Sequence, residues 1–400
     1  MLLRYKTICL YFLLCCFLFS FSKVSYSKQL FSTHQFGKNS AVLVVDPKGE
    51  TLYSWNSDKP LIPASTIKII TAIAAMDIFG GDFRFKTNAL FKNNTLYIKG
   101  FGDPYLTSEE LDIFAHNVHQ KIRTRFLTID RIVVDGTHFP LLSVPGRSAT
   151  SQPYDAPLSA VSANFNTINI KKVGSVITSA EPQTPITPLA KTLSAKLTDG
   201  THRINLVKTE NSEQYFAELF AEKLKSSGFE RQVELKTGFT PVDAELIYQH
   251  VNSKTMAEMV HAMLFYSNNF IANQLFLQMR EQNQAVSFDA SSAFVSKMLA
   301  EDLQGSAQTS LVEGSGLSRE NRMTANQLLR LLKRFQPDKT LMKSYLDGKA
   351  FAKSGTLDGV QNLAGYVTKH NQDYYFVFLF NDSVPWQFRN TLLSELYATL

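Results

Sequence analysis

The chain has 400 residues, of which 44% are hydrophobic and 19% charged, and these values exclude a disordered or fibrous protein. Its length allows two or three domains, each with its own core. The first 27 residues hold three basic residues and no acidic one, so the rest carries 38 basic against 35 acidic residues, a balance that argues against a nucleic-acid partner.

Residues 1–27 have the pattern of a secretory signal peptide. Arg4 and Lys6 precede an apolar run from Ile8 to Phe21, and Ser25–Ser27 offers small residues for cleavage. The run is shorter than the roughly 20 residues of a membrane-spanning helix. All three cysteines lie in this segment, so a cleaved chain has neither disulfides nor thiol catalysis. We expect export across the inner membrane to the periplasm, with loose membrane association and an uncleaved anchor as open alternatives.

The first part of the mature chain, residues 28–85, predicts a hairpin followed by a buried helix. Two short β-type runs, Ala41–Val45 and Thr51–Trp55, flank a turn that contains Pro and Gly. The stretch Ile69–Phe79 is apolar nearly all round, which is typical of a helix buried on every side. Gly80 and Gly81 end it.

The middle of the chain, residues 86–239, predicts a β-rich insert. Its expected strands are separated by Pro- and Ser-rich loops and comprise Thr95–Lys99, Arg131–Asp135, Thr167–Lys171 and Arg203–Lys208. After Pro241 the sequence pattern favours helix.

Helical periodicity dominates residues 240–400 until a final group of strands. The expected helices are Ser253–Phe265, Phe270–Glu281, Ser291–Leu303 and Thr324–Phe335. The expected strands are Ala350–Lys353, Leu363–Thr368 and Tyr374–Phe380, before a closing amphipathic helix at Trp386–Leu400. We therefore predict an α/β domain formed by 28–85 and 240–400, split by the insert.

Ser65 and Lys68 open the buried helix and are candidates for nucleophile and base. Residues three apart share a helical face, and the first turn of a helix favours developing negative charge. A serine hydroxyl needs a nearby base. A lysine serves only if desolvation or a neighbouring cation lowers its pKa, and this apolar helix supplies desolvation.

Two further motifs complete an ordered set. Ser267, Asn268 and Asn269 lie between two predicted helices, and Lys353-Ser354-Gly355-Thr356 ends a predicted strand. Ser-x-x-Lys, Ser-x-Asn and Lys-[Ser/Thr]-Gly in that order are the active-site motifs of penicillin-recognising serine enzymes.

Other segments fit the same motifs by letter. Ser54-Trp55-Asn56 and Ser162-Ala163-Asn164 match the second, and Lys236-Thr237-Gly238 matches the third. The third motif belongs on a strand with further strands and a helix behind it, and only Lys353 has that predicted context.

The chain resembles the D-alanyl-D-alanine carboxypeptidase/endopeptidase family of low-molecular-mass penicillin-binding proteins, the dacB-type serine peptidases. The resemblance runs from Pro63–Ala72 through most of the mature chain. Further stretches that carry it are Asp82–Phe85, Gly100–Pro104, Ala156–Ala160, Gly314–Arg319 and Leu363–Tyr366. Two departures are Asn268, where the family commonly has Asp, and a compact insert.

The resemblance implies a penicillin-binding transpeptidase-like α/β fold and a D-Ala-D-Ala carboxypeptidase acting on the peptide stems of peptidoglycan, with D,D-endopeptidase action on cross-bridges left open. Ser65 would be acylated, with Lys68 as base and Ser267 as proton relay. Asn269 would hold a substrate amide. The substrate carboxylate would be bound by Lys353, Ser354 and Thr356, beside Gly355. Lys353 would also help to keep Lys68 neutral.

The same resemblance implies β-lactam antibiotics as ligands and no metal or organic cofactor. It makes no prediction about oligomeric state. The rival interpretations are a serine β-lactamase, for which a Glu-x-x-Leu-Asn segment is missing, and a non-catalytic wall-binding protein. His116 and His119 have metal-ligand spacing on a polar helical stretch, but without further His or Cys ligands we interpret them as surface residues. Ser315, between two glycines, is interpreted as a loop residue without a paired base.

Overall fold

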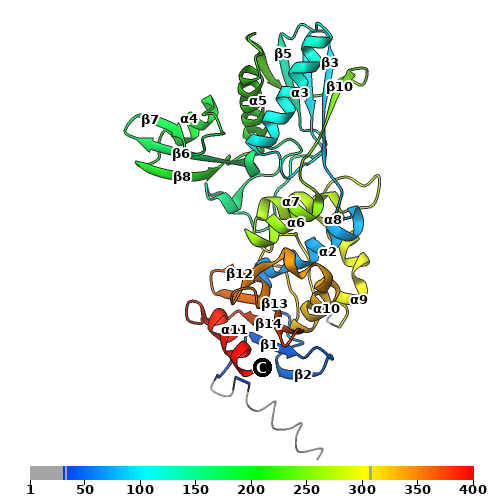
Figure 1. Ribbon diagram of the computed structural model, residues 1–400, viewed down its shortest axis with the longest axis vertical. Helices are drawn as coiled ribbons and strands as arrows, with labels where there is room; N and C mark the ends of the chain where they lie inside the picture. The colour runs from blue at the N-terminus through cyan, green and yellow to red at the C-terminus, as the bar shows by residue number, and fades with distance from the viewer. Residues whose placement is uncertain (1–29, 32–33, 306–308) are drawn as a thin grey trace, which may run out of the picture. The chain divides into compact units, whose positions relative to one another are not determined.

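The computed structural model describes residues 30–31, 34–305 and 309–400, and its helices and strands are labelled in Figure 1. The predicted signal segment, residues 1–27, lies outside the described residues. The chain forms two compact units. Unit 1 consists of the residues up to Thr66 with 302–310 and 322–400, and unit 2 consists of 67–301 with 311–321.

Unit 1 is built on a six-stranded antiparallel sheet whose strands come from both ends of the chain. The order is β11-β12-β13-β14-β1-β2, so β1 pairs with the last strand, β14. The strands are β1 (Ser40–Val45), β2 (Thr51–Trp55), β11 (Lys343–Tyr345), β12 (Ala350–Leu357), β13 (Val360–Lys369) and β14 (Gln372–Phe380). The predicted hairpin and the three predicted final strands are confirmed.

A helix covers each face of this sheet, which explains its apolar central strands. On one face Leu392 and Leu396 of α11 (Phe388–Thr399) pack with Phe376 and Phe378. On the other, α10 (Ala325–Phe335) packs against β1 and β14, and its carbonyl at Leu332 accepts a hydrogen bond from the Tyr366 hydroxyl at 2.6 Å. The 3₁₀ turns of this unit are η1 (Ala64–Ile67) and η4 (Gln336–Leu341).

Unit 2 contains the central helix and the helices that pack on it. Every residue of α2 (Lys68–Phe79) from Lys68 to Ala75 is buried, as its uniform apolarity predicts, and Gly80 ends the helix at φ 81°. The helices α6 (Met256–Phe265) and α7 (Asn269–Gln278) pack on α2, and α8 (Phe288–Met298) packs on α7. The short α9 (Ala300–Leu303) follows α8.

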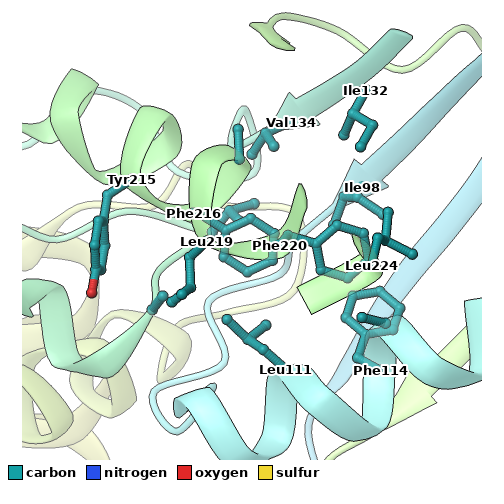
Figure 2. Packing of buried hydrophobic residues seen from close by; sticks show 14 of the residues in the cluster. Ile98, Leu111, Phe114, Ile132, Val134, Tyr215, Phe216, Leu219, Phe220 and Leu224 are labelled. Carbon is teal, nitrogen blue, oxygen red and sulfur yellow. The ribbon is translucent and has the colours of Figure 1, made fainter. Parts of the chain in front are cut away.

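The insert adds a five-stranded mixed sheet in the order β10-β3-β4-β5-β9. These strands are β3 (Lys86–Lys92), β4 (Thr95–Lys99), β5 (Arg131–Asp135), β9 (Glu234–Thr237) and β10 (Glu245–Val251). Two long helices, α3 (Ser108–Thr124) and α5 (Thr209–Ser226), pack on the sheet. Figure 2 shows Ile98, Ile132 and Val134 of the strands facing Phe114 of α3 and Phe220 of α5.

A second, three-stranded sheet belongs to the same insert and has the order β7-β6-β8. Its elements are β6 (Thr167–Val173), β7 (Val176–Ser179) and β8 (Gly200–Asn205), with α4 (Pro188–Ser194) and the turns η2 (Pro153–Asp155) and η3 (Asn164–Asn166).

Two sequence interpretations need correction here. The strands expected in the insert are present. The helix α5 was not predicted, and α3 was predicted only as a polar helical stretch around His116 and His119, although Leu111, Phe114, Val118 and Ile122 repeat at helical spacing. The segment after Pro241, expected to be helical, forms the strand β10, because it pairs antiparallel with β3; Ile247 and His250 are its buried residues.

Candidate active site

The turn that carries Ser65 lies in unit 1 and has a constrained backbone. Ser65 is the second residue of η1 and precedes Lys68, the first residue of α2, by three positions. Ala64 before it has a positive φ of 46°, an uncommon conformation for a residue with a side chain. Thr66 donates from Oγ1 to the Pro63 carbonyl at 2.7 Å. Ser65 is therefore held in a fixed backbone geometry and remains partly exposed.

The third motif packs against this turn within unit 1. A Cβ atom on Gly355 of β12 would lie 2.7 Å from the Pro63 carbonyl oxygen and 3.1 Å from the Ser65 nitrogen, so only glycine fits. Asn362 of the next strand donates to the carbonyls of Ile62 and Pro63 at 2.9 Å each. The strand that bears Lys353 and the turn that bears Ser65 therefore lie side by side.

Lys353 is only 1% exposed, and its Nζ donates to the Ser354 carbonyl at 2.8 Å. Thr356 is exposed, and its Oγ1 accepts a hydrogen bond from Arg389 Nη1 at 2.8 Å. Arg389, on α11, also donates to the Gly355 carbonyl. Sequence reasoning missed Arg389 because its helix is amphipathic and carries no motif.

In unit 2 the buried amine of Lys68 is fixed by two hydrogen bonds. Its Nζ donates to Asn269 Oδ1 at 2.7 Å and to the Ser315 carbonyl at 2.6 Å. Burial lowers the pKa of Lys68 to about 7, and the charge of Glu313 acts in the opposite direction. The desolvation expected from the apolar helix is present, and it makes the neutral amine available near neutral pH.

The second motif forms the connection between α6 and α7. Ser267 adopts a left-handed conformation with φ 55°. The side chain of Asn268 caps α7 by accepting from the Ile271 N–H at 3.0 Å. Since Asn and Asp are both good N-caps, this departure from the family pattern leaves the helix start intact. Asn269 also donates from Nδ2 to the Tyr154 carbonyl at 3.2 Å.

A pocket of about 520 Å³ in unit 2 opens beside this connection. One wall is the segment Tyr266–Ile271, and the other comes from the insert. The insert residues that line it are Tyr105, Pro153, Tyr154, Phe165, Thr167, Glu181 and Arg203. The insert therefore shapes the space next to Ser267.

The loop 313–318 is more highly organised than its sequence predicts. Ser315, interpreted as lacking a base, donates from Oγ to the buried carboxylate of Glu313 at 2.6 Å. That carboxylate accepts four more hydrogen bonds, so it organises the loop rather than activating a serine. The acidic residue directly before Gly-Ser-Gly is the sequence feature from which this role of the loop could have been predicted.

The alternative match to the third motif differs from Lys353 by burial rather than by secondary structure. Lys236 also lies on a strand, β9, which corrects the argument from strand context. It is exposed and pairs with Glu234 at 2.6 Å. A Cβ on Gly238 would meet nothing closer than 3.6 Å, in contrast to Gly355. Ser162 is buried and donates to the Ser159 carbonyl at 3.0 Å.

The two histidines with metal-ligand spacing do not form a site. His116 is exposed, but His119, expected at the surface, is buried and its Nδ1 lies 2.8 Å from the Ser227 carbonyl oxygen. In the part of the chain that the structure describes, no group of three or more His, Cys, Asp or Glu side chains could hold a metal ion.

Comparison with known proteins decides the family. The model of the D-Ala-D-Ala carboxypeptidase 3 (S13) family matches residues 28–198, 197–348 and 338–394. The chain belongs to this family. The membership confirms the predicted enzyme class, a serine-type D-Ala-D-Ala carboxypeptidase and hence a hydrolase.

Similar proteins support the same assignment. A D-alanyl-D-alanine carboxypeptidase of Actinomadura is 26% identical over 408 residues, which covers 83% of this chain and 75% of that protein. The carboxypeptidase DacB of Haemophilus influenzae is 23% identical over 388 residues and 80% of each chain. The crystal structure of penicillin-binding protein 4 from H. influenzae matches 93% of this chain and 99% of its own at a TM-score of 0.71 and 20% identity. The predicted fold class is confirmed.

Proposed function

We propose that this carboxypeptidase acts on the D-Ala-D-Ala ends of peptidoglycan stems through an acyl-enzyme on Ser65. The observation that carries the proposal is the environment of Lys68, a fully buried amine with a pKa of about 7, three residues after a serine in a fixed turn. A general base whose pKa lies near the working pH is deprotonated in a large fraction of the molecules and still accepts a proton readily.

The proposed reaction has two steps. Ser65 Oγ attacks the carbonyl of the penultimate D-Ala and its proton passes to neutral Lys68. The peptide C–N bond then breaks, and the proton reaches the leaving amine from Lys68 through Ser267, which releases D-Ala. Water then hydrolyses the ester and regenerates Ser65. The backbone N–H groups of Ser65 and Thr356 would stabilise the oxyanion.

The remaining motif residues would bind and orient the substrate. Lys353, Ser354 and Thr356 would bind the terminal carboxylate, since a cation with hydroxyl donors suits that group. Asn269 would fix Lys68 through Oδ1 and offer an amide N–H to a substrate carbonyl, with the pocket beside Ser267 as the place for the stem.

A direct assay tests this function. We expect the purified protein to release D-Ala from a D-Ala-D-Ala peptide and to form a long-lived adduct with fluorescent penicillin. Release of single peptide stems from a cross-linked dimer of stems would show that the protein is also an endopeptidase. Rapid penicillin hydrolysis without D-Ala release would identify a β-lactamase instead. If the protein catalyses neither reaction, the interpretation as a non-catalytic wall-binding protein would be favoured.

We further propose that the protein works in the periplasm after cleavage of residues 1–27. The basic start, the short apolar run and the small residues at Ser25–Ser27 support this location. Among the described residues, no helix is both long and apolar enough to span a membrane. We expect N-terminal sequencing of the exported protein to begin near Lys28, whereas a mature form that begins at Met1 would indicate an anchor.

A further inference from the structure

We infer that Glu313 is a positioning residue for Lys68: its buried carboxylate holds the loop 313–318 in the shape that presents the Ser315 carbonyl to the lysine. The inference rests on the proposed role of Lys68 as the base. It assigns a function to a side chain outside the three motifs.

The carboxylate of Glu313 is the structural centre of its loop. The side chain is 0% exposed. One oxygen, Oε2, accepts from the N–H and the hydroxyl of Ser315 at 2.7 and 2.6 Å. The other, Oε1, accepts from Gly316 N at 2.7 Å, Ser318 N at 3.3 Å and Asn321 Nδ2 at 2.8 Å. Five donors around one buried carboxylate fix the loop backbone.

The loop is tied to both helices that hold the base. Thr71, one turn after Lys68 on α2, donates from Oγ1 to the Gly314 carbonyl at 2.7 Å. Asn273, one turn after Asn269 on α7, accepts from the Gly314 N–H at 2.9 Å. Residues one turn apart share a helical face, so α2 carries both Lys68 and a side chain that binds the loop, and α7 contributes one side chain to Lys68 and one to the loop.

The backbone at Gly314 is closely packed against both helices. A Cβ there would lie 2.7 Å from Phe276 Cβ and 2.9 Å from Thr71 Oγ1. The Ser315 carbonyl next to it accepts from Lys68 Nζ at 2.6 Å. Any change that loosens the carboxylate of Glu313 is therefore transmitted to the hydrogen bond between Lys68 and the Ser315 carbonyl.

The charge of Glu313 has a separate effect. Burial lowers the pKa of Lys68, whereas the negative charge of Glu313 raises it, and the balance lies at about 7. Without that charge, burial alone would act and the amine would be a weaker base at every pH. A base that is too weak takes the Ser65 proton less readily.

The two effects are separated by the pH dependence of penicillin acylation. In the wild type the neutral amine is present above the pKa of Lys68, so the acylation rate should rise as pH passes through about 7 and fall below it. In Glu313→Gln the pKa of Lys68 should fall, which moves this acid limb to lower pH by about one unit. The plateau rate should drop about ten- to a hundredfold, since the loop geometry loosens.

Two further variants make the result decisive. Glu313→Asp keeps the charge but shortens the side chain, so we expect a reduced plateau with an acid limb within about half a pH unit of the wild type. Glu320→Gln removes an exposed carboxylate two residues after this loop and should change neither quantity. Circular dichroism and thermal melting establish that each variant is folded.

Each outcome has one meaning. A folded Glu313→Gln with the wild-type plateau rate, or with the wild-type acid limb, overturns the inference. If that variant does not fold, Glu313→Asp decides, because a wild-type plateau there would also overturn it. If acylation of the wild-type enzyme shows no acid limb near pH 7, the proposed role of Lys68 as the base is refuted. That result would remove the premise on which this inference rests.

Discussion

Replacing Ser65 with alanine is expected to abolish covalent labelling by penicillin and to reduce D-Ala release by at least about a thousandfold, because no other group would then form the acyl-enzyme. Mass spectrometry of the labelled wild type should place the adduct on the peptide that contains Ser65. Ser65 is partly exposed in a turn that packs against Gly355, so removal of its hydroxyl should leave the fold intact.

The matched control is Ser54→Ala. Ser54 also begins a Ser-x-Asn match, and its Oγ donates to Ser57 Oγ at 3.1 Å on the exposed strand β2. This variant should label and turn over like the wild type. An adduct on any other serine, or undiminished labelling of Ser65→Ala, would refute the assignment of the nucleophile.

The elements that the sequence predicts best are those with one dominant pattern. The helix α2 is apolar on every side and ends at Gly80, and the strands of unit 1 are short apolar runs between turn residues. Burial on all sides produces such patterns, so they can be read without knowledge of the partner elements.

The elements that the analysis missed combine weak local signals. The helices α3 and α5 carry many charged residues, and their buried stripe faces a sheet assembled from distant segments. Likewise β10 is a strand because it pairs with β3, more than 150 residues earlier in the chain. Tertiary pairing overrides local propensity in such segments.

In the candidate site, too, contacts between distant segments could not be predicted from the sequence. The three motifs were found by spacing and order, but the partners of Lys68 were not. Asn269 lies 201 residues and Ser315 lies 247 residues away from it in the chain. Glu313 belongs to no motif and acts through hydrogen bonds that only the folded loop creates. Sequence spacing predicts the candidate reacting groups, whereas the groups that contact Lys68 depend on packing.

The largest effect expected outside the nucleophile concerns Lys353. We expect Lys353→Ala to lower kcat/KM by at least about a hundredfold, the loss typical of one electrostatic contact in the transition state. The side chain is buried on the strand that packs against the Ser65 turn, so its charge would act on the substrate carboxylate in a poorly solvated place. Acylation rates and D-Ala release of the purified variant measure the loss.

The sequence analysis also expected Lys353 to keep Lys68 neutral. The causes that set the pKa of Lys68 are burial and, in the opposite direction, Glu313, so burial suffices. Lys353→Ala should therefore weaken substrate binding while the acid limb of the pH profile stays near pH 7. A shift of that limb to higher pH would restore the earlier expectation.

Lys236→Ala is the matched comparison, because Lys236-Thr237-Gly238 is the alternative match to the third motif. Lys236 is exposed and pairs with Glu234, and exposed ion pairs contribute little. We expect its kcat/KM to stay within a few-fold of the wild type. If this variant were crippled and Lys353→Ala were active, the site would have to be rebuilt around Ser162 and Thr237. The burial of Ser162, whose hydroxyl is bonded to Ser159, argues against that outcome.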